Sequence, residues 1–147
     1  MTGKGDAFVK MEQSIMIARP VEAVFAYRAS LRQSGEWQTD VLTTELLTVA
    51  PLAVGTRGTE RRRESNDDPS EWDILVTEFE RDRVLGIVST CGSIQIRERD
   101  FFAASEEGNT KYTAQVEMTG SPLPTAVFHK RTVEELTRFR SRLEAQS

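Results

Sequence analysis

The sequence is poor in the residues that build metal sites and disulfide frameworks. Among its 147 residues there are one cysteine, Cys91, and one histidine, His129. A single cysteine cannot form an internal disulfide, and one cysteine with one histidine does not supply the ligand spacing of a zinc site. Glycine-rich phosphate-binding motifs are also missing. We therefore expect no metal and no other cofactor.

Long apolar stretches and an excess of positive charge are missing as well. No segment approaches the roughly 18 apolar residues that cross a bilayer, and the N-terminal residues lack the apolar core of a secretory signal. The 23 acidic side chains outnumber the 19 basic ones, whereas nucleic-acid-binding domains carry a basic excess. These absences predict a cytoplasmic protein with no membrane span and no nucleic-acid partner, either a monomer or a homodimer.

The remaining composition is that of one soluble globular domain. Hydrophobic residues make up 38% of the chain and charged residues 29%, which is the balance of a chain that buries a substantial core. Residues 1–7 are small and polar, so we expect them to form a flexible tail. Residues 8–147 show no repeat and no change of composition, which predicts a single domain.

Periodic patterns predict the order of the secondary-structure elements. Residues 8–18 alternate as a strand does, and Pro20 then suits the first turn of a helix, where a missing N–H costs nothing. One helix over 20–29 and a second short helical segment over 31–37 come next. Further strands are expected at about 41–49, 56–64, 71–79, 84–91, 93–102 and 110–119, and a long helix over 125–146.

This order predicts an α+β protein, with a seven-stranded curled antiparallel sheet around a long C-terminal helix and two short helices after strand 1. Short connections between the strands favour an antiparallel meander. The long helix buries its apolar stripe against the sheet, but one helix does not fill all the space that seven curled strands surround. We therefore expect an internal cavity.

Several segments resemble a known family. They are IARPVEAVFAYRAS, then Trp37-Gln38, then VGTRGTERRR and VTEFERDRVLG. These segments are similar to the polyketide cyclase/dehydrase and lipid-transport group of the START and birch-pollen-allergen superfamily, also called SRPBCC, over residues 11–144. The resemblance implies the helix-grip fold and an elongated apolar ligand more directly than catalysis, because members include cyclases, dehydratases, aromatases and carriers of lipids or hormones.

One expected strand departs from the family pattern. Where relatives usually carry a large aromatic side chain facing the cavity, this sequence has Gly58, which implies a larger pocket. If Gly58 faces inward, Glu60 and Arg62 share its face, because side chains of a strand alternate. A one-residue slip would instead turn three other arginines inward: Arg57, Arg61 and Arg63. We expect the first register, since it leaves more of the arginines in water.

The candidate proton carriers are His129 and Glu60. By helical spacing His129 shares a stripe with Leu136 and would face the cavity, and a histidine transfers protons near neutral pH. A buried carboxylate such as Glu60 does so when its pKa is raised. Arg62 and Tyr112 are the candidates to stabilise an enolate oxygen. The alternatives are a surface or structural His129 and a Tyr112 that only packs in the core.

The candidate ligand-binding residues are Tyr27, Trp37, Gly58, Trp72, Glu98 and Asp100. In relatives an aromatic lid often caps one end of the cavity, which is the role implied for Tyr27 and Trp37. Trp72 either lines the cavity or anchors an edge strand. Glu98 and Asp100 share one face of their strand, which is either solvated or turned inward, where Glu98 would be able to pair with Arg62.

The expected function is the binding of a hydrophobic, partly oxygenated small molecule in the cavity. Catalysis would be a cofactor-free cyclisation or dehydration in the biosynthesis of a natural product, as in polyketide-like pathways. The alternative is a non-catalytic carrier or sensor of a lipid or another small molecule. Because one cavity serves both functions, the sequence leaves this choice open.

Overall fold

The computed structural model describes residues 8–63, 68–120 and 124–146. In chain order the elements are β1 (Phe8–Ile17), α1 (Val21–Ala29), the 3-10 helix η1 (Leu31–Glu36), β2 (Val41–Leu46), β3 (Arg57–Arg62), β4 (Ser70–Glu80), β5 (Val84–Cys91), β6 (Ile94–Ala104), β7 (Thr110–Thr119) and α2 (Thr125–Glu144). The predicted types and order of the elements are confirmed. The expected tail at residues 1–7 lies outside the described residues.

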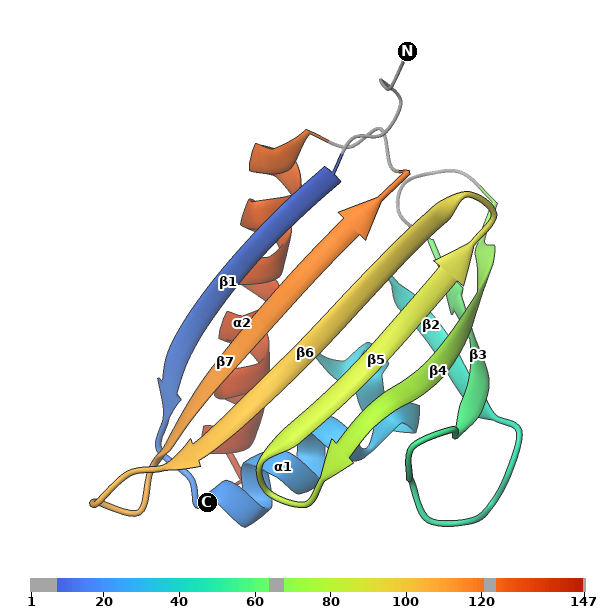
Figure 1. Cartoon of the computed structure of the whole chain (residues 1–147). Helices are drawn as coiled ribbons and strands as arrows, with labels where there is room; N and C mark the ends of the chain where they lie inside the picture. Colours follow the sequence, from blue (N-terminus) through green and yellow to red (C-terminus); the bar gives the residue numbers. More distant parts are fainter. Residues whose placement is uncertain (1–7, 64–67, 121–123, 147) are drawn as a thin grey trace.

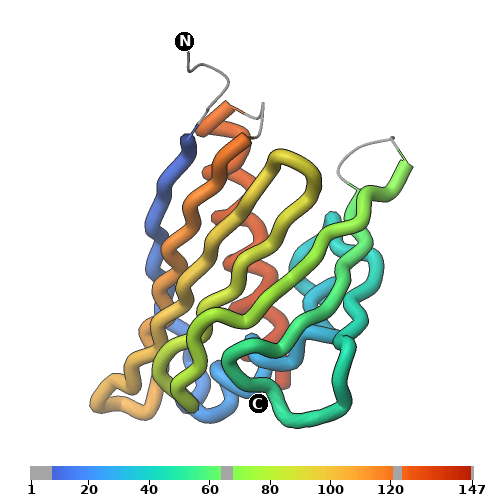
Figure 2. Tube along the Cα trace, turned by 45° about the vertical axis from the view of Figure 1, so that its right-hand side comes forward, coloured from blue at the N-terminus to red at the C-terminus, as the bar shows by residue number. Residues whose placement is uncertain are grey.

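The strands form one seven-stranded sheet in the order β1-β7-β6-β5-β4-β3-β2, and neighbouring strands are antiparallel. Figure 1 shows α2 running behind the β1, β7 and β6 side of the sheet, with α1 crossing near its lower end. The sheet curls, so that β2 and β3 turn away from the plane of the first strands (Figure 2). Both helices therefore lie against its concave face.

The side chains that face the helices follow the expected alternation. On β7 the residues Tyr112, Ala114, Val116 and Met118, which alternate with polar residues in the sequence, are buried. On β3, Gly58 and Glu60 are buried while Arg57 and Arg61 are exposed, which confirms the preferred register of that strand. The cavity-facing side of β3 is thereby fixed.

Helix α2 packs against the sheet through a stripe that begins at Phe128. The buried residues of the stripe are Phe128, Thr132, Leu136, Phe139 and Leu143. His129 is exposed, so the prediction that it faces the interior is wrong. At about 100° per residue, His129 lies about 60° from the centre of the stripe, and in the first turns of the helix that flank is open to solvent.

Aromatic rings fill the space between α1, the second half of α2 and strands β6 and β7. Phe25 packs edge-on to Phe102, with ring centroids 5.1 Å apart, and Phe102 stacks on Tyr112, also at 5.1 Å. Phe139 continues the cluster, because its ring lies 5.0 Å from that of Tyr112 and 4.9 Å from that of Trp37. This part of the interior is closed by ring-to-ring contacts.

Candidate functional site

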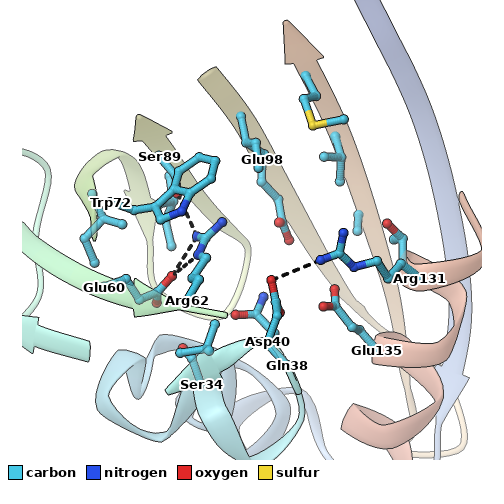
Figure 3. A pocket seen from close by; sticks show the side chains of 18 of the residues that line it. Ser34, Gln38, Asp40, Glu60, Arg62, Trp72, Ser89, Glu98, Arg131 and Glu135 are labelled. Atoms are coloured by element: carbon cyan, nitrogen blue, oxygen red, sulfur yellow. Dashed lines mark hydrogen bonds and ion pairs between the residues drawn. The ribbon is translucent and has the colours of Figure 1, made fainter. Parts of the chain in front are cut away.

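A cavity of about 100 Å³ lies under the concave face of the sheet, between η1, strands β3 to β7 and the first half of α2. Its apolar wall consists of Leu31, Trp37, Val41, Trp72, Ile74, Ile87, Ile94, Ile96, Ala114, Val116, Met118, Phe128 and Leu136. Charged and polar side chains reach into the same space from several elements, as Figure 3 shows. The predicted cavity is therefore present, and it combines an apolar wall with a ring of charged groups.

The first charged group of the site is the pair of Glu60 and Arg62 on β3. Arg62 donates from Nε and Nη2 to Glu60 Oε1, at 2.9 and 2.6 Å, and Thr44 donates to the other carboxylate oxygen at 2.9 Å. The guanidinium group also lies over the ring of Trp72, 4.4 Å from its centroid, and donates to Ser89 at 3.3 Å. Glu60 and Arg62 are thus fixed in place by their partners.

The second charged group comes from α1 and β6. Arg28 is buried and donates from Nε to Asp100 Oδ2 at 2.7 Å and from Nη2 to Glu98 Oε2 at 3.3 Å. Burial opposes the charged form of Arg28, but Asp100 and Glu98 raise its pKa above the ordinary value. Burial, and then the charge of Glu98, raise the pKa of Asp100, while Arg28 opposes that shift. One guanidinium group thus serves two carboxyl groups, which favours a proton on Asp100.

The third charged group joins α2 to the segment before β2. Arg131 pairs with Asp40 at 3.3 Å, and Glu135 lies one turn further along α2, with its carboxyl group turned toward the cavity (Figure 3). Burial raises the pKa of Glu135 to about 8, and the charges of Asp40 and Glu98 add to the shift. Glu135 is therefore a carboxyl group that holds a proton at neutral pH.

Comparison with solved structures places this arrangement among known folds. The Zhui aromatase/cyclase from Streptomyces sp. R1128 has 11% sequence identity and a TM-score of 0.75, over 93% of this chain and 94% of its own. The di-domain ARO/CYC StfQ from the steffimycin biosynthetic pathway has 13% identity and a TM-score of 0.76, over 92% of this chain and 45% of its own. Ara h 8.0201 has 11% identity and a TM-score of 0.73, over 95% of this chain and 99% of its own.

The chain has the helix-grip fold. This confirms the fold that the sequence resemblance implied. No family model and no curated protein matches the sequence, so the likeness concerns the arrangement of the backbone. None of the described helices is long and apolar enough to cross a membrane, and the described residues contain no group of three or more side chains placed to hold a metal ion.

Five of the predicted site residues line the helix-grip cavity. They are Trp37, Glu60, Arg62, Trp72 and Glu98. Asp100 lies directly behind Arg28 and is fully buried. The solvated face that was one alternative for Glu98 and Asp100 is therefore not what the structure shows, and their cation is Arg28 rather than Arg62.

The other predicted residues lie away from the cavity. Tyr112 stands in the aromatic cluster, where its hydroxyl group finds no hydrogen-bond partner of standard geometry among the described residues. Tyr27 packs on Phe139 and donates to Glu36 at 2.8 Å. A Cβ at Gly58 would meet the Glu45 carbonyl oxygen at 2.5 Å, so this glycine allows β2 to approach β3 and does not enlarge the pocket. Together with the exposed His129, these are corrections to the sequence-based site.

Sequence reasoning missed four charged residues of the cavity. They are Arg28, Asp40, Arg131 and Glu135. Arg28 follows Val21 and Val24 at helical spacing, which was a usable signal because an arginine on a buried helix face needs a buried partner. Asp40 stands between two predicted elements, and Arg131 and Glu135 flank the buried stripe of α2, where helical spacing alone gives no signal.

Proposed function

We propose that the protein binds a small, hydrophobic and partly oxygenated molecule in this cavity and catalyses a cofactor-free proton transfer on it, as a cyclisation or dehydration requires. The observation that carries the proposal is the carboxyl group of Glu135. It faces a cavity with a largely apolar wall, and its pKa of about 8 suits the exchange of a proton near neutral pH.

Glu135 takes the role that the sequence assigned to His129 or Glu60. His129 is exposed on the solvent side of α2. Glu60 accepts hydrogen bonds from Arg62 and Thr44 on both carboxylate oxygens, so its structural work is to hold Arg62. Glu135 makes no such bonds with the described residues and keeps its oxygens available to a ligand.

One carboxyl group is sufficient for both halves of a dehydration. As a carboxylate, Glu135 removes a proton from the carbon next to a carbonyl group, and the electron pair of that bond moves to the carbonyl oxygen. As a carboxylic acid, it returns the proton to the departing hydroxyl group, which leaves as water. The guanidinium groups of Arg28 and Arg62 line the same cavity and would stabilise the negative oxygen between the two steps.

The second candidate function is a carrier or sensor that binds the same molecule without changing it. It is favoured by the fixed pairing of Arg62 with Glu60 and of Arg28 with Asp100, because groups held this tightly shape a binding site as well as a catalytic one. The names of two structural neighbours, an aromatase/cyclase and an ARO/CYC, support the catalytic reading by fold analogy.

Exchange of carbon-bound protons tests the catalytic proposal before a substrate is known. Cyclohexanone in D₂O serves as the probe, and proton NMR follows the loss of the signal next to its carbonyl group. We expect the wild type to accelerate exchange and Glu135→Gln to slow it by about 10²-fold or more, with a rate that rises with pH to a plateau above about 8. Glu134→Gln, one residue away and exposed, is the matched control and should leave the rate unchanged.

If the wild type and Glu135→Gln exchange the probe at the same rate, the catalytic proposal is wrong. Mass spectrometry of small molecules released from the purified, denatured protein then tests the carrier. Recovery of an unmodified hydrophobic molecule supports that function, whereas an empty cavity after purification from several hosts speaks against it.

A further inference from the structure

The cavity has more carboxyl groups than cationic groups. Among the described residues the guanidinium groups are those of Arg28, Arg62 and Arg131, and the carboxyl groups are those of Asp40, Glu60, Glu98 and Glu135, with Asp100 behind Arg28. Carboxyl groups therefore outnumber cations in this partly enclosed space, and protons on Asp100 and Glu135, whose pKa values are raised, offset the excess in the empty cavity. Such an excess is costly unless protons or a bound cation compensate for it.

Pairing within the structure accounts for all of these carboxyl groups except one. Glu60 pairs with Arg62, Asp40 with Arg131, and Asp100 and Glu98 share Arg28. Glu135 makes no hydrogen bond and no ion pair with the described part of the chain, although it lines the cavity. Figure 3 shows its carboxyl group directed toward the space that Asp40 and Glu98 also border.

The surroundings of Glu135 oppose a negative charge on its carboxyl group. Burial raises the pKa of its carboxyl group, and the negative charges of Asp40 and Glu98 raise it further, while Arg131 and Arg62 act in the opposite direction. The remaining charged groups of the cavity, Arg28 and Glu60, are already bound to their own partners. Burial and these negative neighbours thus oppose a lone carboxylate at Glu135, so a carboxylate there would need a cation beside it.

We propose that the ligand carries a basic amine, and that its ammonium group binds to Glu135 with Asp40 and Glu98 on either side. This inference rests on the binding part of the proposed function, because it names the class of molecule that occupies the same cavity. A Glu135 carboxylate paired with an ammonium group anchors the ligand, which fits the carrier or sensor rather than the proton transfer. The hydrocarbon part of the ligand packs on the apolar wall formed by residues such as Ile87, Ile96 and Val116. With about 100 Å³ available, that part is no larger than about one ring, since drug-sized ligands occupy pockets of roughly 300–1,000 Å³.

An amine and a neutral molecule differ in whether their binding releases the proton of Glu135. In the empty cavity at pH 7, Glu135 holds a proton. An ammonium ion needs the carboxylate, so its binding releases that proton, and its affinity rises about tenfold per pH unit up to about pH 8. A neutral alcohol accepts a hydrogen bond from the protonated carboxyl group, and its affinity does not rise with pH.

Isothermal titration calorimetry with cyclohexylamine and cyclohexanol distinguishes the two cases. The rings are equal in size, and titration between pH 6 and 8.5 in two buffers of different ionisation enthalpy counts the protons released. We expect cyclohexylamine to bind at least about tenfold more tightly than cyclohexanol at pH 8.5, as a charge-assisted hydrogen bond allows. Near pH 6.5 we expect the release of close to one proton for each amine bound.

Variants of α2 assign the effect to one carboxyl group. Glu135→Gln should bind both probes with similar affinity and release no proton, whereas Glu135→Asp, which retains the acid, and the exposed Glu134→Gln should keep the preference for the amine. If circular dichroism shows Glu135→Gln to be unfolded, the number of protons that the wild type releases on binding cyclohexylamine decides whether the amine inference holds. Equal affinities without proton release overturn the amine inference but leave a cavity that binds small molecules. Failure of both probes to bind the wild type contradicts the proposed function as well.

Discussion

Two halves of the space beneath the sheet differ, although the same sheet and the same helix bound both. Beneath the second half of α2, the rings of Phe102, Tyr112 and Phe139 lie in contact, and none of them borders the cavity. Beneath the first half of α2, the interior is lined by ion pairs such as Arg62 with Glu60, and an open space remains between them. We refer to these parts as the aromatic half and the ionic half.

The difference shows how one fold combines stability with an open site. Rings interlock at van der Waals distance and fill volume without directional demands, so the aromatic half excludes ligands. Ion pairs require fixed partners, and the short side chains between them, such as Ser34, Ser89 and Ala114, do not reach across the gap. We infer that the aromatic half stabilises the fold and that the ionic half leaves room for a ligand.

The largest expected effect comes from shortening one phenylalanine in each half. Phe139 is fully buried against three other rings, so Phe139→Ala should lower the free energy of unfolding by about 4 kcal/mol. Phe128 borders the cavity and already lacks neighbours on one side, so Phe128→Ala should cost only about 2 kcal/mol. Urea denaturation measures both values. Equal losses would mean that the two halves are packed alike.

A somewhat smaller effect is expected from removing the cation where the two halves meet. Arg28→Met leaves Asp100 and Glu98 without their shared partner and should cost about 3 kcal/mol. The loss is limited because Asp100, whose pKa is already raised, can take up a proton. Arg99 pairs with Glu78 on the exposed face of the sheet, so Arg99→Met is the control and should cost less than about 1 kcal/mol in the same urea titration.

The aromatic half was largely predictable from the sequence, because it depends on local periodicity. The alternation around Tyr112 and Val116 fixed the inner face of β7, and the punctuation by turn residues gave each strand to within a few residues. Burial of a large apolar side chain follows from its type and its place in the period. The same rule placed Glu60 and Arg62 inside, because they share the face of Gly58.

The ionic half was only partly predictable, because its pairs join segments that are far apart in the chain. Arg28 meets Asp100 across 72 positions, and Arg131 meets Asp40 across 91. Helical spacing predicted that His129 shares the buried stripe, and it did not single out Glu135 on the other flank. In the structure, the rotation of α2 about its own axis places Glu135 at the cavity and His129 in solvent. That rotation is set by how the helix packs on the sheet.

The smallest of the expected effects is a pH dependence of stability that belongs to the ionic half alone. The pKa of Glu135 is about 8 in the folded chain against an ordinary value of 4.5, so the folded state binds its proton more tightly than the unfolded state. That stabilisation is complete below about pH 4.5 and is lost as the pH rises through about 8. Between pH 7 and 9, wild type should therefore lose about 1–2 kcal/mol relative to Glu135→Gln, measured by urea denaturation at each pH. Phe139→Ala should instead differ from wild type by the same amount at both pH values. The titratable side chains whose rings pack on Phe139 are Tyr27 and Tyr112, and burial raises their pKa values further above this pH range. A constant difference between wild type and Glu135→Gln would show that Glu135 is no more protonated in the folded chain than in water, and the contrast between the two halves would then be one of packing only.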